Sequence, residues 1–126
     1  TTGEDVVRET LVDLSDGGLL SGHILVCAVS LIHRVAAAHP RTVSAITIRR
    51  VIVAAAMLAN KAEADEVFAF THFVACSGLT PELLKATEAQ LFERLSFDVS
   101  TTAPQFHRAL AAIAMHLPDV DAVDVL

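Results

Sequence analysis

The apolar residues of this chain recur every three or four positions, which is the spacing of helices that bury one face. The pattern predicts helices over about residues 5–16, 21–39, 45–61 (or 48–61), 65–76, 81–95 and 103–117. Gly, Pro, Ser or Thr stands at most of the boundaries, where these residues cap or end helices. Residues 120–126 alternate Val or Leu with Asp and are interpreted as a tail. We therefore expect an all-α protein in which residues 1–126 form a single domain.

The third predicted helix is apolar on every side. Residues 51–59 read Val-Ile-Val-Ala-Ala-Ala-Met-Leu-Ala. Such a helix has to be surrounded by others, and its alanines let neighbouring backbones approach closely. The chain is 53% hydrophobic and contains neither Trp nor Tyr. The sequence thus predicts a compact bundle with an aliphatic core, packed around a buried third helix.

Glu88 interrupts the apolar pattern of the helix predicted over residues 81–95. At about 100° per residue, Leu84, Leu91, Phe92 and Leu95 form a stripe, and Glu88 falls in its middle. A carboxylate on a packing face is costly unless it meets a cation or hydrogen-bond donors. Either the fold supplies an internal partner, or this face docks on another protein.

The composition argues against some partners and some cellular locations. The net charge of −6 argues against a nucleic-acid surface, which needs clustered Lys and Arg. The longest apolar runs have about nine residues, whereas a membrane span needs about 20, so no membrane segment is predicted. Cys27 and Cys76 lie in apolar runs and are interpreted as buried free thiols of a reducing, intracellular compartment. The nucleus and the cytoplasm are not distinguished.

No catalytic or metal-binding pattern stands out. His72 and Cys76 are four residues apart on one helix face, but no further ligand pair follows, so no metal site is predicted. No nucleophile elbow and no Gly-rich phosphate loop is present. We expect no enzyme activity, no catalytic residues, no cofactor and no small-molecule substrate. The pair Arg49 and Arg50 is interpreted as a solvated first turn of the third helix.

Four segments together resemble a cyclin box, and the nearest type is similar to the P-type, phosphate-regulon cyclins. The segments are residues 29–35, 50–61, 78–88 and 91–99. The resemblance covers roughly residues 5–106. It implies five helices arranged around the third, which agrees with the hydrophobic pattern, and here a C-terminal helix follows.

The resemblance also implies a function and a site. Cyclins bind a cyclin-dependent protein kinase and reposition its C-helix. By resemblance, Lys61 and Glu88 match the residues that bond kinase backbone groups. The positions matching the apolar pocket for a kinase side chain are Leu58, Phe92, Phe97 and Val99. The implied protein is a regulatory subunit, not an enzyme.

Other readings of these residues stay open. Lys61 could simply be a cation at a helix C-terminus, where the macrodipole favours it. Glu88 could be its internal partner, and a pair formed in the free protein could still open onto a kinase. The apolar residues could be ordinary core. A cyclin-fold scaffold or adaptor in transcription, without kinase activation, is the alternative function, although it would need a basic face for DNA. A ligand-binding bundle would need polar residues converging on a cavity, and none is recognisable in the sequence.

Several positions depart from the cyclin pattern. Ala62 stands where cyclins usually have an aromatic residue, which makes the pocket shallower on that side. His33 replaces the motif Asp, and in the family that Asp pairs with an Arg of the first helix, here Arg8. Only one glycine, Gly78, precedes the fifth helix where P-type members have two. The N-terminal docking motif of mitotic cyclins is absent.

Overall fold

The computed structural model describes residues 3–116, and the regular structure of that part of the chain is helical. The elements are α1 (Gly3–Asp16), α2 (Gly22–Ala38), a 3₁₀ turn (Pro40–Thr42), α3 (Ile48–Glu63), α4 (Phe70–Ser77), α5 (Pro81–Arg94) and α6 (Ala103–His116). The all-α prediction is confirmed. The predicted tail at residues 120–126 lies outside the described residues.

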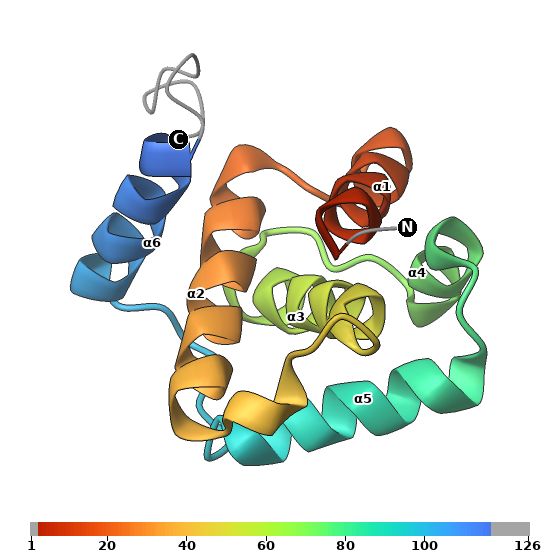
Figure 1. Cartoon of the computed structure of the whole chain (residues 1–126). Helices are drawn as coiled ribbons and strands as arrows, with labels where there is room; N and C mark the ends of the chain where they lie inside the picture. The colour runs from red at the N-terminus through yellow and green to blue at the C-terminus, as the bar shows by residue number, and fades with distance from the viewer. Residues whose placement is uncertain (1–2, 117–126) are drawn as a thin grey trace.

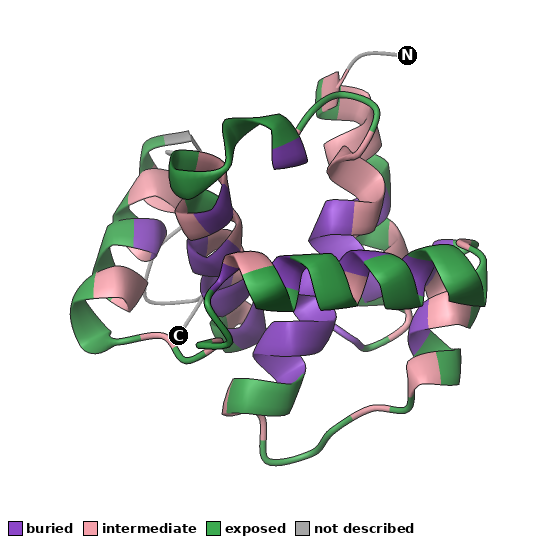
Figure 2. Cartoon of the chain, turned by 90° about the horizontal axis from the view of Figure 1, so that it is seen from below, coloured by how far each residue is buried: buried purple, intermediate pink, exposed green. Residues whose placement is uncertain are grey.

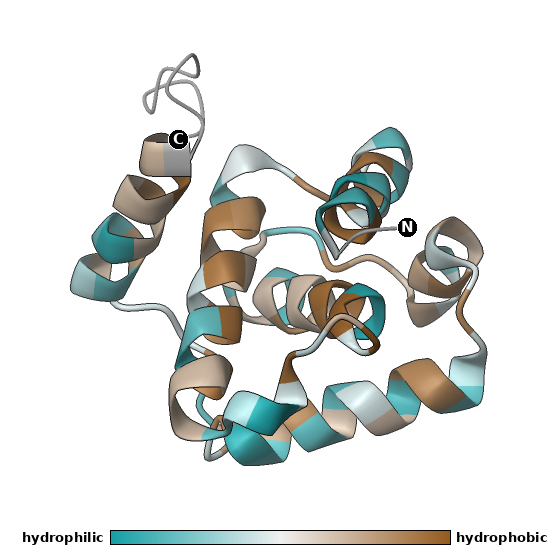
Figure 3. Cartoon of the chain, in the orientation of Figure 1, coloured by the Kyte–Doolittle hydropathy of each residue, from teal (hydrophilic) through white to brown (hydrophobic). Residues whose placement is uncertain are grey.

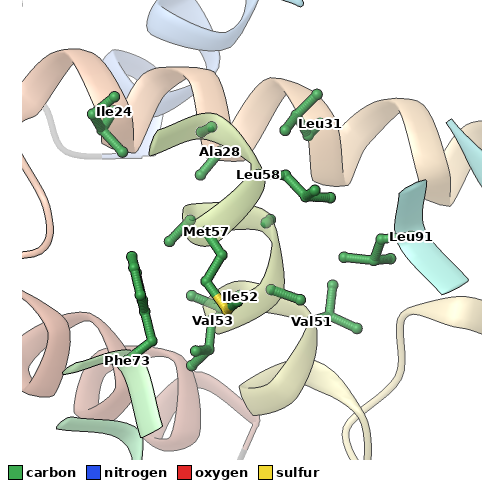
Figure 4. Packing of buried hydrophobic residues seen from close by; sticks show 14 of the residues in the cluster. Ile24, Ala28, Leu31, Val51, Ile52, Val53, Met57, Leu58, Phe73 and Leu91 are labelled. Atoms are coloured by element: carbon green, nitrogen blue, oxygen red, sulfur yellow. The ribbon is translucent and has the colours of Figure 1, made fainter. Parts of the chain in front are cut away.

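Helix α3 occupies the centre of the molecule. Residues 51–60 are all buried, and α1, α2, α4 and α5 surround α3 in Figure 1. The burial colouring of Figure 2 shows the same arrangement, with α3 buried and the outer side of α5 exposed. Side chains from three of these neighbours, including Leu31, Phe73 and Leu91, converge on α3 (Figure 4). The prediction of a bundle around a buried third helix is confirmed.

Helix α6 packs on α2 on the side away from α3 (Figure 1). Ala109 is buried in this contact. The rings of His23 and Phe106 stack with their centroids 5.0 Å apart. The predicted C-terminal helix is therefore present as an addition to the five-helix bundle.

Local capping residues set most helix ends where the sequence predicted them. The Ser21 hydroxyl accepts the Ile24 N–H at 3.2 Å at the start of α2. At the start of α5, Thr80 caps the helix and Pro81 takes its first position, where the missing N–H costs nothing. Gly78 ends α4 with φ +71°, a left-handed conformation that glycine adopts without steric cost.

The prediction for the fourth helix was wrong over residues 65–69, because α4 begins only at Phe70. The preceding segment is held by Asn60, which is buried in α3. The Asn60 side chain accepts the Phe68 N–H at 2.9 Å and donates to the Glu66 carbonyl at 3.1 Å. A buried amide that bonds backbone groups offers them an alternative to a helix. The segment therefore crosses from α3 to α4 without helical hydrogen bonds.

Arg49 is not a solvated residue, contrary to the sequence interpretation. Its guanidinium donates to Asp13 Oδ2 at 2.7 Å and to Thr10 Oγ1 at 3.1 Å, both in α1. It also donates to the Ser77 carbonyl at the end of α4, at 2.6 Å and 3.2 Å. Arg8, in contrast, lies 3.8 Å from Asp5 of its own helix. Arg49 thus joins α1, α3 and α4.

The two cysteines differ in their surroundings, and both are free thiols. Cys27 is buried, and burial raises the pKa of its thiol. Cys76 is only half-buried, so the prediction of two buried thiols holds for Cys27 alone. A Cβ atom at Gly17 would overlap Cys76 Sγ. Glycine at residue 17 therefore allows the end of α1 to approach α4 closely.

Candidate functional site

Lys61 and Glu88 form an ion pair between two neighbouring helices. Lys61 lies in the last turn of α3, and Glu88 lies in the middle of α5. Lys61 Nζ donates to Glu88 Oε2 at 2.8 Å. The Lys61 side chain is 54% exposed, whereas that of Glu88 is 18% exposed. The ammonium group therefore remains in contact with water, and the carboxylate is largely covered.

The sequence placed Glu88 in the middle of the packed stripe of α5, but the structure places it at the edge. The buried positions of α5 and its C-cap are Leu84, Thr87, Leu91 and Leu95. Thr87 is accommodated because its hydroxyl donates to the Leu83 carbonyl at 2.8 Å. This shift of the stripe by one residue leaves Glu88 free to reach Lys61. Residues four apart are neighbours on a helix face, so Phe92 follows Glu88 along the same edge.

Two aromatic rings stand next to this pair on the surface. Phe92 is 37% exposed and Phe97 is 66% exposed. Their ring centroids are 5.2 Å apart, and the rings meet edge to face at 80°, which is a favourable aromatic geometry. Val99 is half-buried against the core, and Leu58 is buried within it. The apolar surface is therefore formed mainly by the two phenylalanine rings.

The backbone that presents Phe97 is unusual. Ser96 and Phe97 have φ values of +55° and +64°, in the left-handed region that non-glycine residues rarely adopt. Hydrogen bonds from the Ser96 N–H to the Glu93 carbonyl and from the Phe97 N–H to the Phe92 carbonyl, both 2.9 Å, hold this turn. Such conformations cost about 1–3 kcal/mol each and concentrate at functional sites. No Gly or Asn marks the turn in the sequence, so local pattern reasoning missed it.

Arg34 of α2 fixes the segment that follows Phe97. Its guanidinium donates to the Asp98 carbonyl at 2.9 Å and to the Ser100 carbonyl at 3.1 Å. The Asp98 carboxylate in turn accepts the Ser100 hydroxyl at 2.5 Å and the Ser100 N–H at 3.0 Å. These two hydrogen bonds hold the pKa of the Asp98 carboxyl below its usual range. Sequence reasoning missed this role because 64 positions separate Arg34 from Asp98.

This arrangement suits the recognition of a protein backbone. An ammonium group can donate to carbonyl oxygens, a carboxylate can accept N–H groups, and exposed aromatic rings can anchor an apolar side chain. Within residues 3–116, no group of three or more His, Cys, Asp and Glu side chains is placed to hold a metal ion. His72 Nε2 instead lies 2.8 Å from the Gly17 carbonyl. Among the described helices, none is both long and apolar enough to cross a bilayer.

One known family matches most of the chain. The sequence profile of the family described as "Cyclin, N-terminal domain" matches residues 6–100. A search of curated proteins finds no match. A search of solved structures also finds none. The match includes Lys61, Glu88 and both surface phenylalanines.

Proposed function

Because the chain belongs to the cyclin family, we propose that it is a regulatory subunit that binds and activates a cyclin-dependent protein kinase. The family supports a regulatory role, and the proposal adds the partner and the mode of action. The chain would dock on the kinase C-helix through the surface formed by Lys61, Glu88, Phe92 and Phe97. We also propose, from the resemblance of its sequence, that its nearest type is the P-type cyclins. We further propose an intracellular location, since two free cysteines suit a reducing compartment.

The observation that carries the proposal is the Lys61–Glu88 pair with its exposed ammonium group. The ends of a helix leave backbone N–H and carbonyl groups without intrahelical partners. Lys61 can donate to such carbonyls, and Glu88 can accept from such N–H groups, once the 2.8 Å contact between them opens. Opening is inexpensive because the Lys61 side chain is already half in water. The pair therefore offers a donor and an acceptor at one place.

The two phenylalanines supply an apolar centre beside that polar pair. Stable interfaces commonly combine an apolar centre with a polar rim, and a few buried aromatic residues carry much of the binding energy. The left-handed backbone at Ser96 and Phe97 holds a ring on the surface at a conformational cost. Ala62, next to Lys61, is exposed and small. We therefore expect the kinase side chain to pack mainly against Phe92 and Phe97 and less against α3.

A panel of purified cyclin-dependent kinases tests the proposal. We expect the chain to bind at least one of them and to raise its turnover of a peptide substrate. The chain alone should show no kinase turnover, because its site offers no catalytic constellation. Failure to bind or activate any kinase, or turnover by the purified chain that a point change in it abolishes, would contradict the proposal.

A further inference from the structure

A second surface feature lies between α2 and α6. It is a cleft of about 300 Å³, lined by Ser30, His33, Arg34, Ala37, Gln105, Arg108 and Ala109. On each helix the lining residues recur at spacings of three and four positions, with His33 next to Arg34 and Arg108 next to Ala109, so they share one face. Figure 3 shows hydrophilic stretches on α2 and α6 where the two helices lie side by side. The cleft is distinct from the surface around Lys61 and Glu88.

The polar groups of the cleft are mostly hydrogen-bond donors. The Gln105 Oε1 already accepts the Thr102 N–H at 2.8 Å, so its amide NH₂ remains to donate. Arg34 uses two of its N–H groups on backbone carbonyls, and a guanidinium carries five. The guanidinium of Arg108 has no hydrogen bond or ion pair to any residue that the structure describes. The cleft therefore presents several unused N–H groups.

Ser30 adds a hydroxyl to the lining of the cleft. Its side chain lines the cleft, yet the residue is only 4% exposed. Within residues 3–116, its hydroxyl has no hydrogen-bond partner, unlike Thr10 and Thr87, whose hydroxyls donate to backbone carbonyls one turn earlier. Among the described residues, the buried side-chain polar atom without a partner is Thr101 Oγ1, not Ser30 Oγ. The Ser30 hydroxyl is therefore open to the cleft and can bond a polar ligand there.

The charge of the cleft selects the kind of ligand. The chain has 15 Asp and Glu against 9 Lys and Arg, yet the lining contains two arginines and no carboxylate. Guanidinium groups match the geometry of phosphate oxygens and bond them strongly. A phosphate group carries a charge of about −1.5 to −2 at neutral pH and three acceptor oxygens when it is esterified.

We propose that the α2–α6 cleft binds a phosphate group, either as inorganic phosphate or as the phosphoryl group of a phosphorylated side chain. Arg108 and Arg34 would neutralise its charge. The Ser30 hydroxyl and the Gln105 amide would each donate a hydrogen bond to its oxygens, with the His33 imidazole at the rim.

Nuclear magnetic resonance titration of the full chain tests the site. The probes are inorganic phosphate and N-acetyl-phosphoserine amide, each added at constant ionic strength. The test variants are Arg108→Gln and Ser30→Ala, and the matched control is Arg8→Gln, which removes the same charge from α1. Arg34 is left unchanged because it also holds the segment after Phe97.

Saturable shifts of the amides around the cleft are expected. Arg108→Gln should raise Kd about tenfold, which corresponds to about 1.4 kcal/mol, and Arg8→Gln should leave it unchanged. Ser30→Ala should weaken binding while leaving the melting temperature unchanged or higher, because the free hydroxyl has no partner to lose. Equal affinity for both probes would indicate free phosphate, and tighter binding of the phosphoserine probe would indicate a phosphorylated partner. No saturable binding of either probe, or equal weakening by Arg8→Gln and Arg108→Gln, would overturn the proposal.

Discussion

At the scale of single residues, the Lys61–Glu88 pair is suited to binding more than to stability. The Glu88 side chain is largely covered, but the Lys61 side chain is 54% exposed. Water weakens the attraction between such charges, and exposed ion pairs contribute about 0–1 kcal/mol to folding. The pair can therefore open onto a partner at little cost to the fold.

We predict that Glu88→Ala and Lys61→Ala change the melting temperature little but sharply weaken kinase binding and activation. The double variant should lose scarcely more binding than either single variant, because both groups contact the same partner element and are coupled. A thermal melt of the free chain and a titration with the kinase measure the two effects. Glu9→Ala, at an exposed position of α1, is the control. Strong destabilisation with unchanged kinase binding would show that the pair is structural.

Phe92→Ala should weaken kinase binding by about 2 kcal/mol or more if this ring is a principal anchor. Leu83→Ala provides a matched control, because Leu83 lies on the same helix and has the same 37% exposure as Phe92, but it belongs to the first turns of α5. Both variants are compared by titration with the kinase. Similar losses for the two variants would remove Phe92 from the docking surface.

At the scale of elements, the ends of the helices depend on local caps, but the link from α3 to α4 depends on one buried side chain. Asn60 bonds the link through both ends of its amide. Asn60→Ala removes these bonds and leaves buried backbone groups unsatisfied. We predict a loss of about 1–3 kcal/mol in the free energy of unfolding.

Urea unfolding of the Asn60→Ala variant measures this loss. The control is Ala62→Ser, two positions later at an exposed site of the same helix. Unchanged stability of the Asn60 variant would mean that water replaces both hydrogen bonds, and the link would then not depend on this side chain.

At the scale of the whole molecule, polar contacts supplement the apolar packing around α3. Arg49 bonds α1 and the end of α4 at the same time, although it starts from the first turn of α3. It is partly covered, and its partner Asp13 is more exposed, so solvent screening reduces the value of the ion pair.

We predict that Arg49→Gln lowers the free energy of unfolding by about 1–2 kcal/mol, because hydrogen bonds to the Thr10 hydroxyl and the Ser77 carbonyl are lost together with the ion pair. Arg50→Gln is the matched control, since the neighbouring arginine makes no such contacts among the described residues. Denaturant unfolding compares the two. Equal effects would show that only net charge matters here.

The sequence by itself determined the helical class, the buried third helix and most helix ends. These follow from spacing and local chemistry: residues 51–59 are apolar on every side, and Ser21, Thr80 and Gly78 act on backbone groups a few residues away. The pairing of Lys61 with Glu88 was one of two readings open to the sequence. Their kinase-binding role stays a prediction from family membership.

Only the tertiary structure decided features that join distant parts of the chain. The contacts of Arg49 and Arg34 and the α2–α6 cleft form only because particular helix faces pack together. A local sequence pattern does not indicate which faces these are. The same reason explains the error at Glu88, because only the neighbouring helix determines, to one residue, which face of a helix packs. At residues 65–69 the cause is close in the sequence: Asn60 is buried in α3 and bonds backbone groups of Glu66 and Phe68, six and eight residues later, that a helix would otherwise use.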